Sequence, residues 1–322
     1  MSAMTQPLIH FNRTTGTLTG ATAWERLVTL ALIAGSKVSS IFYHRGYNTC
    51  ANLLRKTVPS RDIAMTLKRD AVFTFPFSDG YWSKFLNRAF LYEAEFDLLL
   101  KDNAQADYTL LDCGANYGYW SVLVSSEIYG SHRAIAIEPS SQNLRILSNN
   151  AKVNGSRFKV LHAAIGRARG KARLSGTKHE AFSIAGSQDT SGEEVAVLAL
   201  DNLIDDGLIA PTGKYVVKLD VEGVETEALT GAARLAQTDA IFYCEEHGND
   251  PHHTVSRFIL DETPLTLVVF DPATDRFVTL DDLKLLDSIK TASHVGYNVF
   301  ATASPFWLER IAALNKRLAG SR

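Results

Sequence analysis

The chain has 322 residues, of which 46% are hydrophobic and 21% charged, and this composition is ordinary for a globular protein. Its length allows one large domain with additions, or two domains. The formal net charge of -2 provides no general basic field, which argues against nucleic acid as a partner.

The N-terminus and the cysteines indicate a cytoplasmic protein. The first residues are polar and include no basic segment of a secretory signal. The longest early apolar run, residues 27–34, is too short to span a bilayer. Cys50, Cys113 and Cys244 lie far apart and form no C-x-x-C pair, so neither a disulfide framework nor a structural zinc site is expected.

Residues 1–84 are predicted to form a helical extension that caps the main domain. Residues 1–20 have the composition of a loose leader, whereas apolar residues recur at roughly helical spacing over 24–43, and a second helix is predicted over 49–58. A peripheral membrane contact through residues 24–58, or a lid over the substrate, is the alternative interpretation. Five side chains would make such a surface positive: Lys37, His44, Arg45, Arg55 and Lys56.

Beyond this extension, a short strand is predicted over 71–77 and a helix over 82–100, and then strands and helices alternate regularly. Strands are predicted at 108–113, 134–137, 158–162, 195–199, 214–220, 240–244, 265–270 and 295–301. Helices are predicted at 117–129, 140–153, 225–236, 252–260 and 305–318, with a short one beginning at Leu200. The polar segment 167–193 is expected to form short hairpin strands or a mobile loop.

This alternation is typical of a doubly wound α/β domain with a mostly parallel sheet. We assign residues 85–303 to that domain, and residues 304–322 to an amphipathic helix packed on it.

The segment 108–120 contains the most informative turn of the chain. A buried strand, a glycine-rich turn and a helix follow one another there, as in nucleotide-binding α/β units. The glycines, Gly114 and Gly118, are spaced as G-x-x-x-G, and not as the G-x-G-x-x-G of dinucleotide sites. Asp112 at the strand end would repel a pyrophosphate but attract an ammonium group. With Asn116 between the glycines, the turn suits S-adenosylmethionine better than NAD. The alternative is a glycine-rich turn that binds no ligand.

Glu138 follows the next strand, and 138 − 118 places it 20 residues after Gly118. A carboxylate at this offset accepts hydrogen bonds from both ribose hydroxyls of an adenosine, in NAD and in S-adenosylmethionine alike. The alternative is an acid that stabilises the N-terminus of helix 140–153. The small side chain of Ala163, after the third strand, could flank the adenine.

Acidic residues also end the fourth and fifth core strands, at Asp220 and at Glu245-Glu246. Ligands of open α/β sheets bind at the carboxyl ends of the strands, and acids gathered there favour a cationic ligand. Asp220, His247 and Glu246, in that order, are the candidates for a general base, although His247 could equally be a surface histidine. Lys218 is in phase with Asp220 and could pair with it.

These features together resemble the FkbM family of S-adenosylmethionine-dependent methyltransferases, a branch of the class I methyltransferase fold. The resemblance extends over about residues 85–303, and its most specific part is K-x-D-x-E-G-x-E. The matching segments are Leu111–Gly118, Glu138-Pro139, Val217–Glu225 and Glu245-Glu246-His247, with Tyr92-Glu93 preceding them.

The resemblance implies a seven-stranded sheet whose last strand is antiparallel, S-adenosylmethionine as the methyl donor, and most often O-methylation. Acceptors in the family are diverse small molecules and glycans. Asp112 would face the amino acid moiety of the donor and Glu138 its ribose. The other predicted cofactor-binding residues are Gly114, Asn116, Tyr117, Gly118, Ala163 and Asp220.

We expect no metal ion, because the sequence shows no dedicated ligand set. Two other functions compete with a methyltransferase, namely an NAD-dependent oxidoreductase and a non-catalytic S-adenosylmethionine-binding scaffold. A nucleic-acid amino-methyltransferase is disfavoured, because the segment after the fourth strand lacks a Pro-Pro-aromatic turn. Nothing in the sequence indicates the oligomeric state.

Overall fold

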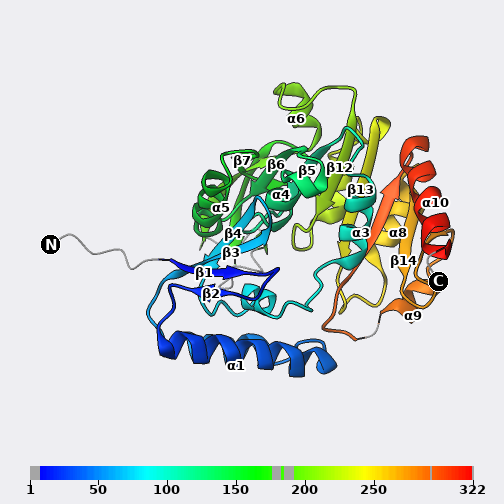
Figure 1. Cartoon of the computed structure of the whole chain (residues 1–322). Helices are drawn as coiled ribbons and strands as arrows, with labels where there is room; N and C mark the ends of the chain where they lie inside the picture. The colour runs from blue at the N-terminus through cyan, green and yellow to red at the C-terminus, as the bar shows by residue number, and fades with distance from the viewer. Residues whose placement is uncertain (1–7, 176–182, 185–191, 291, 321–322) are drawn as a thin grey trace.

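The computed structural model describes residues 8–175, 183–184, 192–290 and 292–320. Its centre is an eight-stranded sheet, with helices on both faces (Figure 1). The order of the strands across this sheet is β15 (Arg276–Leu280), β14 (Thr266–Asp271), β16 (Tyr297–Thr302), β13 (Asp239–Glu246), β12 (Lys214–Leu219), β5 (Thr109–Cys113), β6 (Arg133–Glu138) and β7 (Lys159–His162).

Five neighbouring strands, from β13 to β7, run parallel, and β16 runs antiparallel to both of its neighbours. The predicted sheet with an antiparallel last strand is therefore confirmed. The expectation of seven strands missed β15, which adds an edge strand by pairing antiparallel with β14. This strand is short and lies only five residues after β14, so the two form a hairpin.

The two faces of the sheet bury two separate apolar cores, because successive residues of a strand point to opposite sides. Leu110 of β5 belongs to one core and Leu111 to the other. The helices of the main domain are α3 (Ala94–Asp102), α4 (Tyr119–Val124), α5 (Ser141–Val153), α6 (Asp201–Asp205), α7 (Glu225–Thr230), α8 (Thr254–Glu262), α9 (Lys284–Ile289) and α10 (Pro305–Gly320). Helices α3, α4, α5 and α10 cover the first core, and α6 to α9 cover the second.

The segment after β7 forms the predicted hairpin strands as a separate small sheet, with order β10-β9-β11-β8. Its strands are β8 (Ala164–Ile165), β9 (Gly170–Ser175), β10 (Ser183–Ile184) and β11 (Glu193–Leu198). The rest of the segment that was predicted as hairpins or loop, residues 176–182 and 185–191, lies outside the described residues.

The N-terminal region contains the predicted helices as α1 (Ala23–Ser39) and α2 (Tyr47–Arg55), joined by the short 3-10 helix η1 (Ser40–Phe42). It also contains a second sheet, with order β2-β1-β3-β4, so a purely helical description is incomplete. The prediction of a loose leader over 1–20 is wrong where β1 and β2 form. The strands are β1 (Ile9–Asn12), β2 (Leu18–Thr19), β3 (Asp62–Lys68) and β4 (Ala71–Pro76). β1 pairs in parallel with β3 across both helices, and local periodicity cannot show such a distant partner.

Two asparagines of α5 join this N-terminal sheet to the main domain. Asn150 accepts a hydrogen bond from the Thr74 backbone N–H at 2.7 Å and donates to the Thr74 carbonyl at 3.0 Å. Its amide also donates to the Tyr117 carbonyl at 2.8 Å, within the glycine turn. One turn further along, Asn154 bonds both backbone groups of Val72. Together they pair with β4 as a neighbouring strand would.

The helix predicted over 82–100 is wrong in its middle. The structure has a 3-10 helix, η2 (Trp82–Leu86), and then α3, which begins after Glu93 in the left-handed region at φ 46°. Apolar residues at helical spacing misled the prediction, because they pack on α1 and α4 from a bent chain. The helices predicted over 117–129 and 225–236 are similarly divided, ending as η3 (Glu127–Tyr129) and η4 (Leu235–Gln237).

We expect the substitution Asn150→Leu to lower the free energy of unfolding by at least about 3 kcal/mol. It leaves the buried backbone groups of Thr74 and the Tyr117 carbonyl without their partner, at about 1–3 kcal/mol for each unsatisfied group. Chemical denaturation would measure the change. The substitution Gln142→Leu, at an exposed position of the same helix, is the control and should cost less than about 1 kcal/mol. Equal losses in the two variants would contradict this role of Asn150.

Candidate active site

A cleft of about 840 Å³, part of it open to solvent, lies at the carboxyl ends of β5, β6 and β12. Six of the predicted site residues line it: Asp112, Gly114, Asn116, Glu138, Ala163 and Asp220. Further lining residues are Tyr81, Trp82, Tyr92, Ala115, Tyr119, Trp120, Pro139, Asn143, Ala164, Ile165, Leu174, Lys218, Val221, Glu222 and Val224. The cleft thus forms where the sequence predicts it, at the ends of the parallel strands.

The glycine turn brings the end of β5 against the end of β12. A Cβ atom added to Gly114, which has φ 75°, would lie 1.8 Å from the Asp220 carbonyl oxygen. A side chain is therefore excluded at this position, and the absence of one places Asp112 and Asp220 in the same cleft. Gly118, at φ 84°, precedes α4, and its added Cβ would meet Leu147 at 2.4 Å. Gly118 and the buried Tyr117 belong to the turn, but they do not line the cleft.

Asp112 is buried at the end of β5 and accepts two hydrogen bonds from Ser121 of α4. The hydroxyl donates at 2.7 Å and the backbone N–H at 3.2 Å, both to Oδ2. Burial raises the pKa of Asp112, and the Lys218 ammonium and the Ser121 bonds oppose this rise. These bonds fix the orientation of the carboxylate in the cleft wall.

Glu138 ends β6 and is held by three donors. The backbone N–H of Asn116 lies 2.8 Å from Oε2, and the N–H of Ser140 and the amide of Asn143 lie 3.0 and 3.2 Å from Oε1. Burial raises the pKa of Glu138 to about 7, although these donors oppose the shift. The carboxyl group is oriented by the glycine turn on one side and by the start of α5 on the other. Ser140 caps α5, accepting from the Asn143 N–H.

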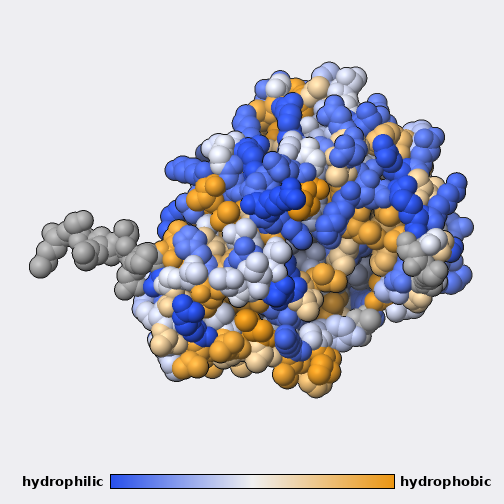
Figure 2. All heavy atoms as spheres, in the orientation of Figure 1, coloured by the Kyte–Doolittle hydropathy of each residue, from blue (hydrophilic) through white to orange (hydrophobic). Residues whose placement is uncertain are grey.

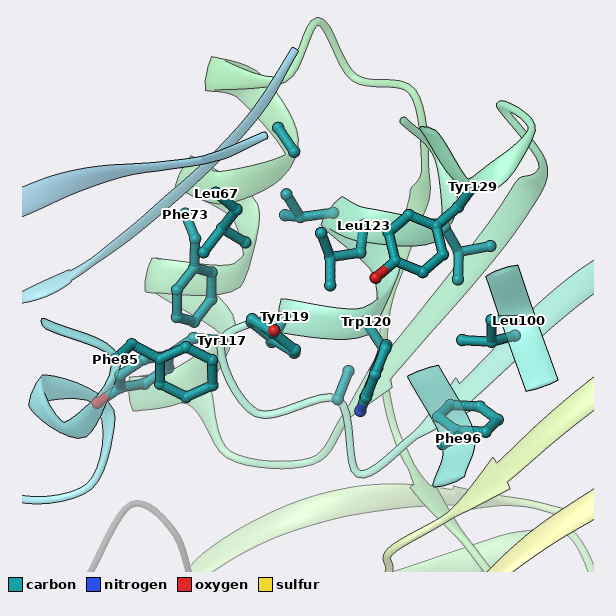
Figure 3. Close-up of a cluster of buried hydrophobic side chains, with 14 of the residues drawn as sticks. Leu67, Phe73, Phe85, Phe96, Leu100, Tyr117, Tyr119, Trp120, Leu123 and Tyr129 are labelled. Atoms are coloured by element: carbon teal, nitrogen blue, oxygen red, sulfur yellow. The ribbon is translucent and has the colours of Figure 1, made fainter. Parts of the chain in front are cut away.

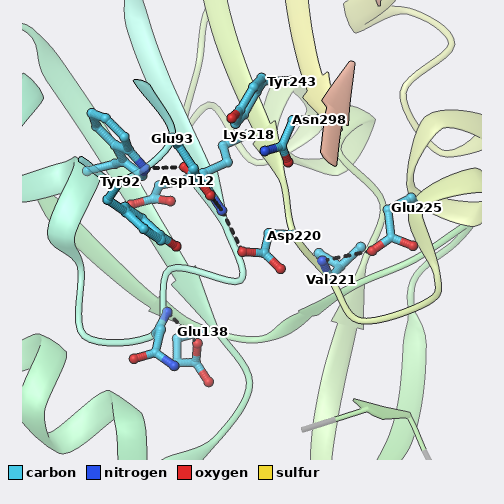
Figure 4. Close-up of polar contacts among 12 residues, drawn as sticks. Tyr92, Glu93, Asp112, Glu138, Lys218, Asp220, Val221, Glu225, Tyr243 and Asn298 are labelled. Atoms are coloured by element: carbon cyan, nitrogen blue, oxygen red, sulfur yellow. Dashed lines mark hydrogen bonds and ion pairs between the residues drawn. The ribbon is translucent and has the colours of Figure 1, made fainter. Parts of the chain in front are cut away.

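A buried lysine organises the other side of the cleft (Figure 4). The Lys218 ammonium lies 2.7 Å from Asp220 Oδ2 and 3.7 Å from Glu93 Oε1. Burial alone would lower the pKa of Lys218, but Asp220, Glu93 and Asp112 outweigh it and raise that pKa. The pairing of Lys218 with Asp220, inferred from their alternation in the sequence, is confirmed.

Asp220 shares a hydrogen bond with a second carboxyl group, that of Glu245. Burial favours the neutral form of Asp220, but Lys218 and the bond from Glu245 lower its pKa. Burial and the charge of Asp220 hold the pKa of Glu245 well above its usual range. The pair therefore keeps its negative charge on Asp220, the member that lines the cleft.

Glu93 is the acid that the sequence left without a role beyond the family resemblance. Its left-handed backbone turns the side chain inward, where Oε2 accepts from the Trp120 indole and Oε1 faces Lys218. Burial raises the pKa of Glu93 to about 7, against the opposing charge of Lys218. Beside it, Tyr243 and Asn298 both donate to Glu95, at 2.6 and 3.2 Å. These partners come from β13 and β16.

Aromatic side chains from η2 and α4 form the wall above the glycine turn, and Figure 3 shows how they continue into the core. The Trp82 indole donates to Asn116 Oδ1 at 3.1 Å, which ties η2 to the turn. The Tyr81 hydroxyl donates to the Tyr92 hydroxyl at 3.3 Å. Burial raises the pKa of both tyrosines, so neither is a candidate base. Sequence reasoning missed this wall, because η2 meets the turn only in the folded chain.

The structure does not bring the other two predicted bases into the cleft. Glu246 is buried and accepts from the backbone N–H groups of Val255 and Ser256, and from the Ser256 hydroxyl at 2.7 Å. It therefore fixes the start of α8, and we do not propose it as a base. His247 is half-buried beyond β13, where its charge would act on Asp220 and Glu225. It does not line the cleft.

The side chains that line the cleft fit S-adenosylmethionine in charge and in size. Four acidic residues (Asp112, Glu138, Asp220 and Glu222) and one basic residue (Lys218) line it, which favours a ligand with positive charge. The small or apolar side chains of Ala163, Ile165 and Leu174 provide a surface for the adenine. Among the described residues, no group of three or more His, Cys, Asp or Glu side chains could hold a metal ion.

Residues 112–262 match the family model of the methyltransferase FkbM domain. This segment of the chain is a methyltransferase FkbM domain. The resemblance seen in the sequence is thereby confirmed for these residues. No curated protein matches the chain significantly.

Solved structures share only a distant likeness with this FkbM protein. A methyltransferase FkbM from Methylobacillus flagellatus KT is 18% identical, with a TM-score of 0.38, over 61% of this chain and 43% of that one. The chain therefore spans less than half of that relative. An O-methyltransferase from Bacillus cereus in complex with SAH is 13% identical, with a TM-score of 0.38, over 66% and 81% of the two chains. Precorrin-6y C5,15-methyltransferase from Geobacter metallireducens GS-15 is 14% identical, with a TM-score of 0.37, over 66% and 88%.

The raised pKa values of Glu93 and Glu138 predict a stability that depends on pH. Both lie at about 7, above the ordinary value of 4.5, so between these values the folded chain binds more protons than the unfolded chain. The free energy of unfolding should therefore fall as the pH rises through this window. The substitution Glu93→Gln should remove the part of this pH dependence that Glu93 contributes, roughly 1–3 kcal/mol of unfolding free energy between about pH 4 and pH 8.

Denaturant unfolding at several pH values would measure this difference. Glu262→Gln, at an exposed position on α8, serves as the control and should unfold with the pH dependence of the wild type. An unchanged slope in Glu93→Gln would show that the carboxyl group of Glu93 titrates normally.

Proposed function

We propose that this FkbM domain transfers a methyl group from S-adenosylmethionine to a hydroxyl group of a small-molecule or glycan acceptor, with sugars and natural products as the leading classes. The observation that carries the proposal is the carboxyl group of Asp220, which lines the same cleft as the glycine turn and lies 2.7 Å from the Lys218 ammonium. A carboxylate beside the cofactor cleft can accept a hydrogen bond from an acceptor hydroxyl.

The bound cofactor would supply a methyl group on a positively charged sulfur, which is already an activated leaving group. The work left to the chain is binding, orientation and the exclusion of water. In this proposal Asp112 meets the amino acid moiety, Glu138 the ribose, and Ala163 the adenine. Tyr81, Trp82 and Tyr92 close the side of the cleft where the acceptor would enter.

The proton of the acceptor hydroxyl needs a destination, and Asp220 is our first candidate. Lys218 keeps Asp220 ionised, and the protonated Glu245 behind it leaves no second negative charge in contact. His247 does not line the cleft, so we assign it at most an influence on Asp220 through its charge. The proposal of O-methylation rests on this arrangement and on the family resemblance.

Cofactor binding provides the direct test. We expect the purified chain to bind S-adenosylhomocysteine in the micromolar range by calorimetry, and NADH not at all. Asp112→Asn and Glu138→Gln keep the size of each side chain but remove its charge, so both should weaken binding by about ten-fold or more. Glu262→Gln is the matched control. Binding of NADH alone would overturn the proposal in favour of an oxidoreductase, and binding of neither ligand would also overturn it.

The role of Asp220 can be tested once an acceptor is found, using radiolabelled S-adenosylmethionine and a panel of sugars, glycans and phenols. As a general base, Asp220 should contribute about 10²–10⁴-fold to kcat, so Asp220→Asn should lose that factor. The affinity of the Asp220→Asn variant for S-adenosylhomocysteine should stay within about three-fold of that of the wild type. A large loss of that affinity with kcat retained would instead make Asp220 a cofactor ligand, as the sequence also allows.

A further inference from the structure

Helix α1 exposes a continuous stripe of apolar side chains on the side that faces away from the protein. Leu30 is 62% exposed and Ile41, at the end of the same stripe, is 73% exposed. In Figure 1, α1 lies along the lower edge of the molecule, and Figure 2 shows hydrophobic residues gathered along this edge. The large exposed apolar residues of the region are Trp24, Leu27, Leu30, Val38, Ile41, Phe42, Tyr43 and Leu53. We call this surface the α1 face.

The stripe follows the helical repeat, so it is a property of one side of the helix. Positions 24, 27, 31, 34, 38 and 41 are all apolar and exposed, at intervals of three or four residues. The opposite side of α1 buries Val28 and Leu32 in the core below. A helix that is apolar on both sides, with only one side buried, leaves a contiguous patch of the kind that marks an interaction surface.

The segment that forms most of the α1 face carries only positive charges. Residues 26–60 contain five basic residues and no acidic residue: Arg26, Lys37, Arg45, Arg55 and Lys56. All five are exposed. The rest of the chain then has 33 − 5 = 28 basic and 35 acidic residues, which gives it a net charge of -7 against +5 for this segment. Positive charge is therefore concentrated around the apolar stripe.

We propose that the α1 face docks on the surface of a membrane that contains anionic lipids, with α1 lying in the plane of the interface. An apolar stripe with basic residues at its edges matches acyl chains below and anionic headgroups around them. A second copy of the chain fits less well, because two such faces would bring ten positive charges together. No helix among the described residues is long and apolar enough to cross a membrane, so the contact is peripheral.

The docking surface is rigid enough to act as a unit. The Trp24 indole donates to the Thr57 carbonyl at 3.0 Å, which links α1 to the end of α2. The start of α1 is fixed by a capping box, in which Thr22 and Glu25 bond each other's backbone N–H groups. Glu25 also pairs with Arg61 at 3.4 Å, so the one acid of α1 lies inside and adds no negative charge to the face.

Co-sedimentation of the purified chain with vesicles tests the proposal. We expect binding to phosphatidylcholine vesicles that contain phosphatidylglycerol, much weaker binding to phosphatidylcholine alone, and release by high salt. Leu30→Glu and Ile41→Glu should each weaken vesicle binding by roughly ten-fold or more. Lys37→Gln and Arg45→Gln should each weaken it by roughly five-fold.

Val153→Glu, which places the same charge on an exposed apolar residue of α5, is the matched control and should bind like the wild type. Circular dichroism of each variant separates lost binding from lost folding. Light scattering of the chain in solution tests whether a second copy of the chain binds to the α1 face instead. No binding to anionic vesicles, equal binding by the Glu variants of α1, or a dimer that Leu30→Glu separates would each overturn the proposal. None of these readouts depends on the proposed methyl transfer.

Discussion

The buried ammonium of Lys218 is the interaction on which the candidate site depends. A charge with 3% of its surface exposed is costly to bury unless opposite charges surround it. Asp220, directly after β12, and Glu93, in the turn before α3, provide these opposite charges. In return, Lys218 keeps Asp220 ionised among other acids. The bent chain at Glu93 and the close approach at Gly114 both follow from the need to gather these groups around one cation.

The sequence predicted several residues that line the cleft, because their positions depend on local features. A carboxylate at a strand end, followed by a turn that excludes Cβ atoms, needs only a few consecutive residues to be recognised. Asp112, Gly114 and Glu138 were found in this way, and all three line the cleft. The parallel sheet was equally accessible, since alternating strands and helices have few other ways to pack.

What the sequence did not predict involves partners that are distant in the chain. Glu246 has the same pattern as Asp220, an acid at a strand end, but only its contact with α8 shows that it holds a helix. The N-terminal sheet escaped prediction because β1 pairs with β3 across two helices. The helical spacing around Phe90 came from packing on neighbouring elements, and periodicity alone cannot distinguish that from a helix. The edge strand β15 adds a hairpin that the family pattern does not contain.

The 3-10 helix η2 connects the two surfaces described above. It contributes Trp82 to the cleft, while Ser83 bonds Tyr47 of α2 at 3.0 Å and the Lys84 carbonyl accepts from Ser36 of α1. The same short helix thus contacts the cleft and the buried side of α1, whose opposite side is the α1 face. An enzyme held at a bilayer in this way would meet a lipid-linked acceptor by diffusion in two dimensions. For the membrane-bound protein, the rate of encounter would then follow the number of acceptors per unit area of membrane.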